Sequence, residues 1–347
     1  MTKIPHKQAR GFSLMEMLVS CAILAIVLFA VASMMNMTSR TYRHTSGKID
    51  AFETANVAFD TLTQTLRQAT LVSYFGYNDK SDPTQYVFRS NLHFYLNPSL
   101  SGVFGLKGRL VPNTHSVFFQ APIGIVIGNN DTEHKTLQTL NALLNCTGFF
   151  IAYSEEPSRP AILDGRVTER YRRRLFQYIQ PRRPLAANHV YQFTVKDHGF
   201  LPAPDDKFDG TSWFQSEVSN RTNCHVLAEN VVALVIRPMA SHNPTSYRWN
   251  SRLGDPENDL ENLPPSFGKM PRSLKIVMAV IDEASAARLG NSLVDPLEDL
   301  LDELFRFEST AQFDADIKTL DIRLSERNLN YRVFTAEILL NTSNTNL

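Results

Sequence analysis

The chain has 347 residues, of which 35 are basic and 35 acidic, so its formal net charge is zero. Zero net charge excludes a general electrostatic attraction of the whole chain to nucleic acid or to anionic membranes. Hydrophobic residues make up 43% of the chain and include 22 Phe and 11 Tyr. This composition excludes a disordered chain and predicts one large core or two smaller ones.

The first element is an apolar segment near the N-terminus. Nineteen residues without a charge run from Met17 to Met35, and as a helix they would span about 28 Å, close to the hydrocarbon thickness of a bilayer. Lys3, Lys7 and Arg10 precede the segment, and basic residues at that end keep the N-terminus in the cytoplasm. The small residue Gly11 lies before the apolar run, whereas a cleaved secretory signal has its small-residue site after it. We therefore expect a single-pass inner-membrane protein with its bulk in the periplasm or outside the cell.

One carboxylate, Glu16, lies at the start of this apolar run. A lone carboxylate costs roughly 2–3 kcal/mol at mid-bilayer and less near the interface, so such residues usually have a partner. A simple signal anchor does not explain a carboxylate at this position. The arrangement resembles the N-terminus of type IV pilins and pseudopilins. The matching residues are Arg10, Gly11, Phe12, Ser13, Leu14, Glu16, Leu18 and Val19.

This resemblance implies a processing route and an assembly contact. In the family, a prepilin peptidase cuts after the Gly that precedes a Phe and methylates the new amine, which here places the cut between Gly11 and Phe12. Glu16 is then the fifth residue of the mature chain. The resemblance implies that it pairs with the amine of Phe12 on a neighbouring subunit and so sets the axial register.

The second element continues the same helix. Apolar residues recur every three or four positions beyond the membrane segment, which is typical of one face of an amphipathic helix. These residues are Ile49, Phe52, Ala55, Phe59, Leu62, Leu66 and Ala69. The stripe is too short and too irregular for a coiled-coil seam, so we expect it to pack on a sheet. A helix from Phe12 to Val72 would be about 90 Å long, with a bend predicted at Ser46–Gly47.

From about Gly76, short β-rich runs alternate with Pro, Gly, Asn and Asp. The predicted strands are Tyr86–Tyr95, Ser116–Ile127, Phe149–Tyr153, Val190–Val195, Val231–Arg237, Leu274–Ile281 and Tyr331–Leu340, and the predicted helices are Leu137–Leu144, Pro296–Phe305 and Ala311–Leu324. The fold class is α+β, with a long N-terminal helix packed on a largely antiparallel, pilin-like head that carries loop insertions. The expected organisation is a leader at 1–11, a transmembrane segment at 12–37, a helix extension at 38–75 and the head at 76–347.

Several blocks of the chain are similar to the pilin-like family called Verru_Chthon cassette protein C and, less specifically, to J-type minor pseudopilins. These blocks are TSRTYR from Thr38, FETANVAFDTLTQTLRQATLVSYFGYND from Phe52, YVFRSNLHFYL from Tyr86, PRSLKIVMAVIDEASAARL from Pro271 and NLNYRVFTAEILL from Asn328. The resemblance implies an extracytoplasmic pilin-like head but defines little of its biochemical role.

The sequence offers no catalytic constellation. It contains no G-x-S-x-G, P-loop or G-x-G-x-x-G motif, and its nine histidines and three cysteines lack the spacing of a zinc site. We therefore expect no enzyme activity, no cofactor and no metal centre. Cys146 and Cys224 would both lie outside the cytoplasm, where a disulfide between them can form, but their spacing does not decide whether they pair, and a buried free thiol is the favoured interpretation.

Two clusters of charge remain. Arginines are concentrated between Arg166 and Arg183 and interleaved with aromatic residues, a pattern that suits anionic polymers such as DNA. Arg172, Arg173 and Arg174 form the candidate anion site, but a solvated hairpin that docks on acidic neighbours is the favoured interpretation. The second cluster contains alternating acidic residues. Asp255, Glu257, Asp259 and Glu261 suit calcium, but an exposed acidic loop is favoured because no EF-hand glycine is present.

The sequence as a whole predicts a prepilin-like subunit of a type IV pilus or a type II secretion-like pseudopilus. Its expected partners are a prepilin peptidase, other pilin-like subunits and the inner membrane. Its long head suggests a minor subunit, because bulky insertions would crowd a tight helical fibre. The alternative is a binding module for DNA or another anionic polymer that is displayed on a pilin anchor.

Overall fold

A computed structural model describes residues 13–71, 74–77, 86–89, 94–97, 108–125, 143–156, 160, 162, 165–180, 183–184, 191–192, 212–221, 223–239, 246–251, 266, 268–305 and 309–340. The chain divides into two units, one ending at Asp50 and the other beginning at Ala51. The long helix α1 extends over Leu14–Arg67 and contributes to both units. It is continuous through Ser46–Gly47, where a bend was predicted.

The head contains a seven-stranded sheet in which every pairing is antiparallel. Its order is β10-β7-β6-β5-β3-β12, and β4 pairs with β6 beyond the end of β5. The strands are β3 (Tyr95–Asn97), β4 (Gly108–Leu110), β5 (Ser116–Pro122), β6 (Leu144–Ser154), β7 (Arg172–Gln180), β10 (Cys224–Glu229) and β12 (Trp249–Asn250). The central strands β5, β6 and β7 are buried along nearly their whole length, because both faces of the sheet are covered.

A second antiparallel sheet has the order β11-β13-β14. It consists of β11 (Val231–Met239), β13 (Ser273–Ile281) and β14 (Tyr331–Leu339). The near-continuous apolar run LKIVMAVI forms the central strand β13, as the sequence predicts. The chain passes from β10 in the first sheet to β11 in the second through Asn230 alone, which adopts a left-handed conformation with φ of 60°.

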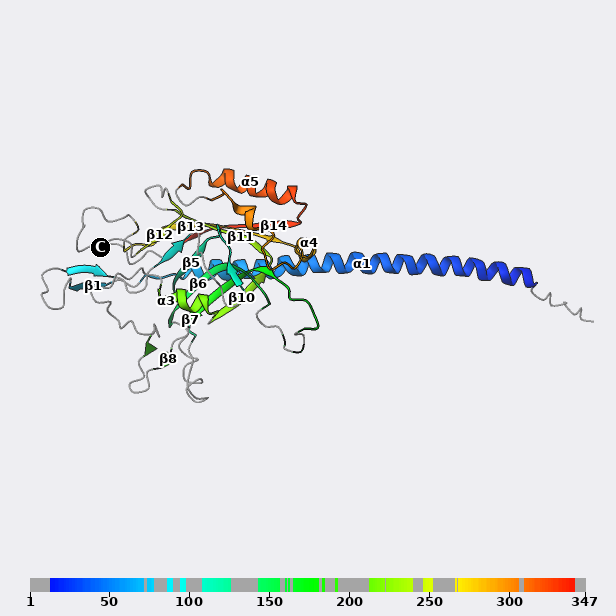
Figure 1. Ribbon diagram of the computed structural model, residues 1–347, viewed down its shortest axis with the longest axis horizontal. Helices are drawn as coiled ribbons and strands as arrows, with labels where there is room; N and C mark the ends of the chain where they lie inside the picture. The colour runs from blue at the N-terminus through cyan, green and yellow to red at the C-terminus, as the bar shows by residue number, and fades with distance from the viewer. Residues whose placement is uncertain are drawn as a thin grey trace, which may run out of the picture. The chain divides into compact units, whose positions relative to one another are not determined.

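Within the unit that begins at Ala51, the C-terminal part of α1 packs with both sheets, and the other helices cover the outer faces of the sheets (Figure 1). The predicted stripe is buried from Ala55 to Ala69 and forms one core with the facing sides of both sheets, where Phe59 meets Phe334 at 5.7 Å between ring centroids. A second core lies between the other face of β11-β13-β14 and the helices α4 (Glu283–Leu289), η2 (Glu298–Leu301) and α5 (Phe313–Glu326). The short helix α3 (Ser212–Ser219) packs Phe214 and Val218 on the outer face of the seven-stranded sheet.

The predicted fold class is confirmed, because a long apolar helix is combined with antiparallel sheets in an α+β head. Two small pairings complete it, β1 with β2 and β8 with β9. Their strands are β1 (Tyr74–Tyr77), β2 (Tyr86–Arg89), β8 (Arg183–Pro184) and β9 (Tyr191–Gln192).

Several predicted elements were displaced or missed. The strand predicted for Tyr86–Tyr95 is divided into β2 and β3, and β7, β10 and α4 were not predicted. The helix predicted for Leu137–Leu144 is wrong at Leu144, where β6 begins, and its residues before 143 lie outside the described residues. The predicted helix Pro296–Phe305 is reduced to the single turn of η2, because Glu303 and Phe305 both have positive φ.

Candidate functional site

The N-terminus of α1 is closed by a reciprocal pair of hydrogen bonds. The backbone N–H of Ser13 donates to Glu16 Oε2 at 3.0 Å, and the backbone N–H of Glu16 donates to Ser13 Oγ at 3.2 Å. This is a capping box, which satisfies two backbone donors that a helix start would otherwise leave open. The carboxylate also lies at the positive end of the helix dipole. In the single chain, Glu16 is therefore bonded within its own first turn.

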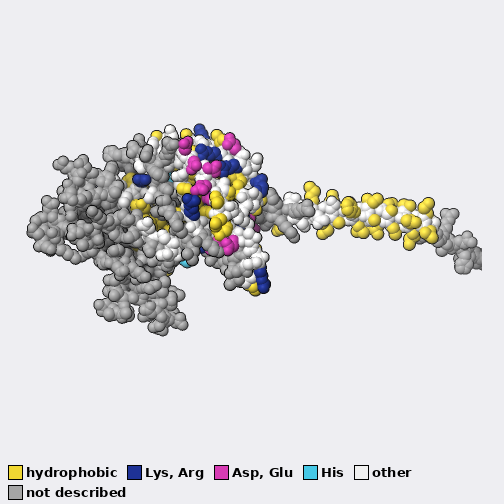
Figure 2. All heavy atoms as spheres, viewed as in Figure 1, with side chains coloured by type: hydrophobic (Ala, Val, Ile, Leu, Met, Phe, Trp, Pro, Cys, Tyr) yellow, Lys and Arg dark blue, Asp and Glu magenta, His cyan; other side chains and the backbone are white. Residues whose placement is uncertain are grey.

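The helix that follows Glu16 has the dimensions of a membrane span. Leu14–Ser39 is a stretch of 26 residues that is apolar enough to cross a bilayer, and its side chains are exposed within the described part of the chain. Apolar side chains cover this part of the helix (Figure 2). An exposed apolar helix of this length requires lipid or the apolar surface of other helices. Gly11 and Phe12, the predicted processing site, lie outside the described residues.

The head contains a second candidate site, the arginine cluster, which we define as Arg170, Arg172, Arg173 and Arg174. The last three belong to β7, which was not predicted as a strand, and their side chains are only 6%, 3% and 0% exposed. The expectation of a solvated hairpin was therefore wrong for these three residues. Burying three guanidinium groups is tolerable only where each finds carboxylate or carbonyl partners.

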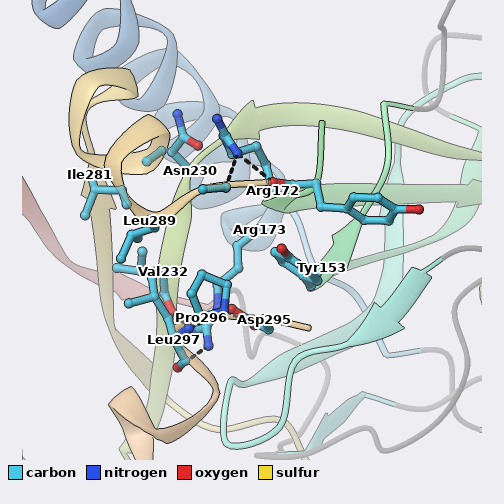
Figure 3. Close-up of a pocket in the computed structure, with 13 residues that line it drawn as sticks. Tyr153, Arg172, Arg173, Asn230, Val232, Ile281, Leu289, Asp295, Pro296 and Leu297 are labelled. Atoms are coloured by element: carbon cyan, nitrogen blue, oxygen red, sulfur yellow. Dashed lines mark hydrogen bonds and ion pairs between the residues drawn. The ribbon is translucent and has the colours of Figure 1, made fainter. Parts of the chain in front are cut away.

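Arg173 has the most complete set of partners (Figure 3). Its Nε donates to Asp295 Oδ2 at 2.8 Å, its Nη1 to the carbonyl of Val232 at 2.7 Å, and its Nη2 to the carbonyl of Leu297. Burial lowers the pKa of the Arg173 guanidinium, and the carboxylate of Asp295 opposes that shift. Burial also raises the pKa of the neighbouring Tyr153 to about 12, with Asp295 adding to the effect. The raised pKa keeps the Tyr153 hydroxyl protonated at neutral pH.

The other arginines share two glutamates. Glu283 at the start of α4 accepts from Arg170 at 3.3 Å and from Arg172 at 3.2 Å. Glu229 at the end of β10 accepts from Arg170 at 3.0 Å and from Arg174 at 2.9 Å. Asn230, the residue that joins the two sheets, donates to the second oxygen of Glu283 at 2.8 Å. The cluster therefore connects β7 of the first sheet to β11, α4 and the segment after it.

The same contacts close the outer edge of β11. The carbonyl of Val232 accepts from Arg173, the carbonyl of Leu234 accepts from the N–H of His115 at 2.8 Å, and the N–H of Ile236 donates to His115 Nδ1 at 2.9 Å. Two side chains and one loop amide thus bond alternate backbone groups along this edge of β11. They take the position that a further strand would otherwise occupy. This arrangement joins the two sheets and removes an open edge from β11.

The cavity beside the cluster is too small for an organic ligand. It lies between Tyr153, Arg172, Asn230 and the segment from Gly290 to Leu297, and its volume is about 20 Å³. That volume matches a single water molecule. Among the described residues, Nε of Arg172 and Oδ1 of Asn230 have no hydrogen-bond partner, and both are polar groups that suit a water in this cavity. Arg172, Arg173 and Arg174 make their contacts within the head, and their burial does not suit a DNA backbone, which requires exposed cations.

Of the two interpretations left open for Cys146 and Cys224, the fold supports thiols and not a disulfide. Cys146 lies opposite Gln180 of β7, and Cys224 lies opposite Tyr178 of the same strand, so β7 separates the two cysteines. Two strand spacings amount to about 10 Å, whereas bridged cysteines have Cα atoms within about 7 Å. Both cysteines are present as thiols.

The remaining charged residues do not assemble a metal site in the described part of the chain. No group of three or more His, Cys, Asp or Glu side chains there could hold an ion. The predicted acidic loop with Asp255, Glu257, Asp259 and Glu261 lies outside the described residues. On the face of the head in Figure 2, the described basic and acidic side chains are interspersed, so they form no single-sign surface.

Comparison with known proteins identifies one family model. Residues 6–32 match the prokaryotic N-terminal methylation motif, a stretch that includes Gly11, Phe12 and Glu16. No curated protein and no solved structure matches the chain. The motif supports a type IV pilin-like protein and indicates a structural subunit rather than an enzyme. With its single N-terminal apolar helix, the chain fits a single-pass inner-membrane protein that a prepilin peptidase processes.

Proposed function

We propose that the chain is a minor subunit of a type IV pilus or pseudopilus, cut between Gly11 and Phe12 and methylated on the new amine. The motif match over residues 6–32 carries this proposal. The exposed apolar span Leu14–Ser39 supports it, because the span needs lipid before assembly and other apolar helices afterwards. The leader at 1–11 remains in the cytoplasm, the transmembrane segment comprises 12–37, the helix extension 38–75 follows, and the head at 76–347 lies in the periplasm or outside the cell.

In this proposal Glu16 exchanges partners during assembly. The single chain holds its carboxylate in the capping box with Ser13. Cleavage makes Phe12 the first residue and creates an amine, and a charge-assisted bond to the amine of a neighbour is stronger than the bond to a neutral amide. The carboxylate is therefore kept bonded in the bilayer and becomes available to the next subunit at little cost.

The first experiment is the mass of the mature N-terminal peptide from cells with and without a prepilin peptidase. We expect a peptide that begins at N-methylated Phe12 and disappears without the peptidase. An intact Met1 terminus in both strains would refute the processing route and leave a simple membrane anchor.

A matched pair of variants separates the two roles of Glu16. Glu16→Gln keeps an oxygen for the capping box but removes the charge, whereas Ser13→Ala removes the hydroxyl acceptor of the box and keeps the charge. We expect both variants to be processed, and only Glu16→Gln to be lost from isolated fibres. Equal incorporation of both would contradict the pairing of Glu16 with the Phe12 amine.

The minor role rests on the size of the head and is tested by the abundance of the chain in the same fibres. A dominant component would contradict it. Display of a DNA-binding module finds no support in Arg172, Arg173 and Arg174, since all three are buried and bonded within their own chain.

A further inference from the structure

We infer that the outer edge of β14 is a docking site for an extended strand of a neighbouring subunit. This inference rests on the proposed function for the identity of the partner, but its structural basis is independent of it. It begins from the pairing of β14 with β13, which is unbroken from Ser273↔Leu339 to Ile281↔Tyr331.

The register determines which backbone groups of β14 face outward. Just beyond the strand, Leu340 N–H donates to the carbonyl of Arg272, and at the other end Asp282 N–H donates to the carbonyl of Asn330. In an antiparallel pair, hydrogen-bonded positions alternate with positions whose N–H and C=O point away. The even-numbered residues therefore bond to β13. The odd-numbered residues of β14, namely Tyr331, Val333, Thr335, Glu337 and Leu339, direct their backbone groups to the outer edge.

The two edge strands of the β11-β13-β14 sheet differ in whether their outward backbone groups are hydrogen-bonded. Arg173 and His115 bond the outward groups of β11, as described above. Along β14, no described residue bonds the outward groups, and the strand contains neither a bulge nor a proline. Native proteins usually blunt a long edge by such devices, because an open edge recruits other strands. Within the described residues, one edge of the sheet is closed and the other is left open.

The exposed side chains point to the chemistry of the partner. Thr335, Glu337 and Leu339 share one face of β14, and Leu339 is 71% exposed. Lys275 lies opposite Glu337 on β13, but its ammonium is paired with Asp314 at 3.3 Å. The Glu337 carboxylate therefore has no ion pair within the described residues. A row of alternating N–H and C=O groups fits another extended peptide. We expect that peptide to place a Lys or Arg opposite Glu337 and an apolar side chain beside Leu339.

Removal of one outward backbone N–H tests the docking of a partner strand without removing a hydrogen bond between β14 and β13. Thr335→Pro removes an outward N–H that β13 does not use, and proline is tolerated on a strand edge when its nitrogen faces outward. Thr335→Ala is the matched control, because it removes the same side chain and keeps the N–H. In the experiment, the photo-crosslinking residue p-benzoylphenylalanine replaces Leu339 in the full-length chain. A second chain carries it in place of Ile322 on α5 as the control, since that side chain is also exposed.

We expect an adduct with another chain from position 339 in the wild type and in Thr335→Ala, and at least a fivefold loss in Thr335→Pro. Peptide mapping should place the partner's crosslinked residue in an extended segment of a pilin-like subunit. Absence of an adduct, equal yield in both variants, or a partner residue in a helix would overturn the inference. An adduct that persists when the Met1 terminus is intact would instead refute the processing route and leave the docking edge standing.

Hydrogen exchange provides a test that does not depend on the proline variant folding. In the purified chain in detergent micelles, the amides of Val333, Thr335 and Glu337 should exchange at least tenfold faster than those of Phe334 and Ala336. In isolated fibres, the first set should become as slow as the second. Unchanged fast exchange in fibres would overturn the inference, whatever the behaviour of Thr335→Pro.

Discussion

Removal of the Arg173 side chain should destabilise the head by about 4 kcal/mol. The substitution Arg173→Ala leaves Asp295, whose side chain is only 9% exposed, as a buried carboxylate without its cation. Breaking one partner of a buried ion pair costs about 3–5 kcal/mol, because the remaining charge is uncompensated. It also removes a donor from the carbonyls of Val232 and Leu297, which a water entering the site would only partly replace.

The assay is urea denaturation of the full chain in detergent micelles, followed by the fluorescence of the buried Trp249. Arg166→Ala is the matched control, since this arginine belongs to the same basic run but is exposed, and surface changes stay within about 0.5 kcal/mol. The double variant Arg173→Met, Asp295→Asn should be more stable than Arg173→Met alone, because it removes the orphaned charge. If Arg173→Ala lowers the free energy of unfolding no more than Arg166→Ala does, the proposed stabilising role of the Arg173 contacts is wrong.

Two further predictions concern the core. Gly148→Ala would place its Cβ 2.1 Å from Cδ1 of the buried Phe118 ring, so we expect a loss of about 2 kcal/mol in the same assay, and the loss should shrink in a Phe118→Leu background. Burial lowers the pKa of His115 to about 4 from its ordinary 6.5, so the unfolded chain binds more protons between these values, and stability should fall by about 3 kcal/mol as pH drops through that window. Replacement of His115 by Gln should flatten this pH dependence, and an equally steep curve in that variant would assign it to other groups.

The parts of the fold that the sequence predicts are those with strong local patterns. The apolar stripe from Ala55 to Ala69 has helical spacing, and the run LKIVMAVI is typical of a strand covered on both faces, so α1 and β13 were found with nearly correct bounds. The capping box could also be predicted from the sequence, because Ser13 stands three residues before Glu16. Glu16 was interpreted from the sequence only through the family resemblance.

The arginine cluster could not be predicted in the same way. Three consecutive arginines indicate a solvated surface unless carboxylates surround them, and their partners Glu229, Glu283 and Asp295 are between 55 and 122 residues away in the chain. Only the tertiary fold brings these groups together. The sequence left the pairing of Cys146 and Cys224 open for a related reason, since spacing along the chain does not reveal that β7 lies between them.

The order of the strands along the chain has a consequence for synthesis. β13 is the central strand of its sheet and is strongly apolar, yet β14, which covers one of its edges, is made only after the segment from Asp282 to Asn330. At ribosomal rates this interval lasts roughly 3–10 s, during which a nascent chain presents an aggregation-prone strand with one side open. Premature termination before Tyr331 would make that exposure permanent. The expected product of such a truncation is therefore an aggregate or a chaperone-bound chain instead of a shorter head.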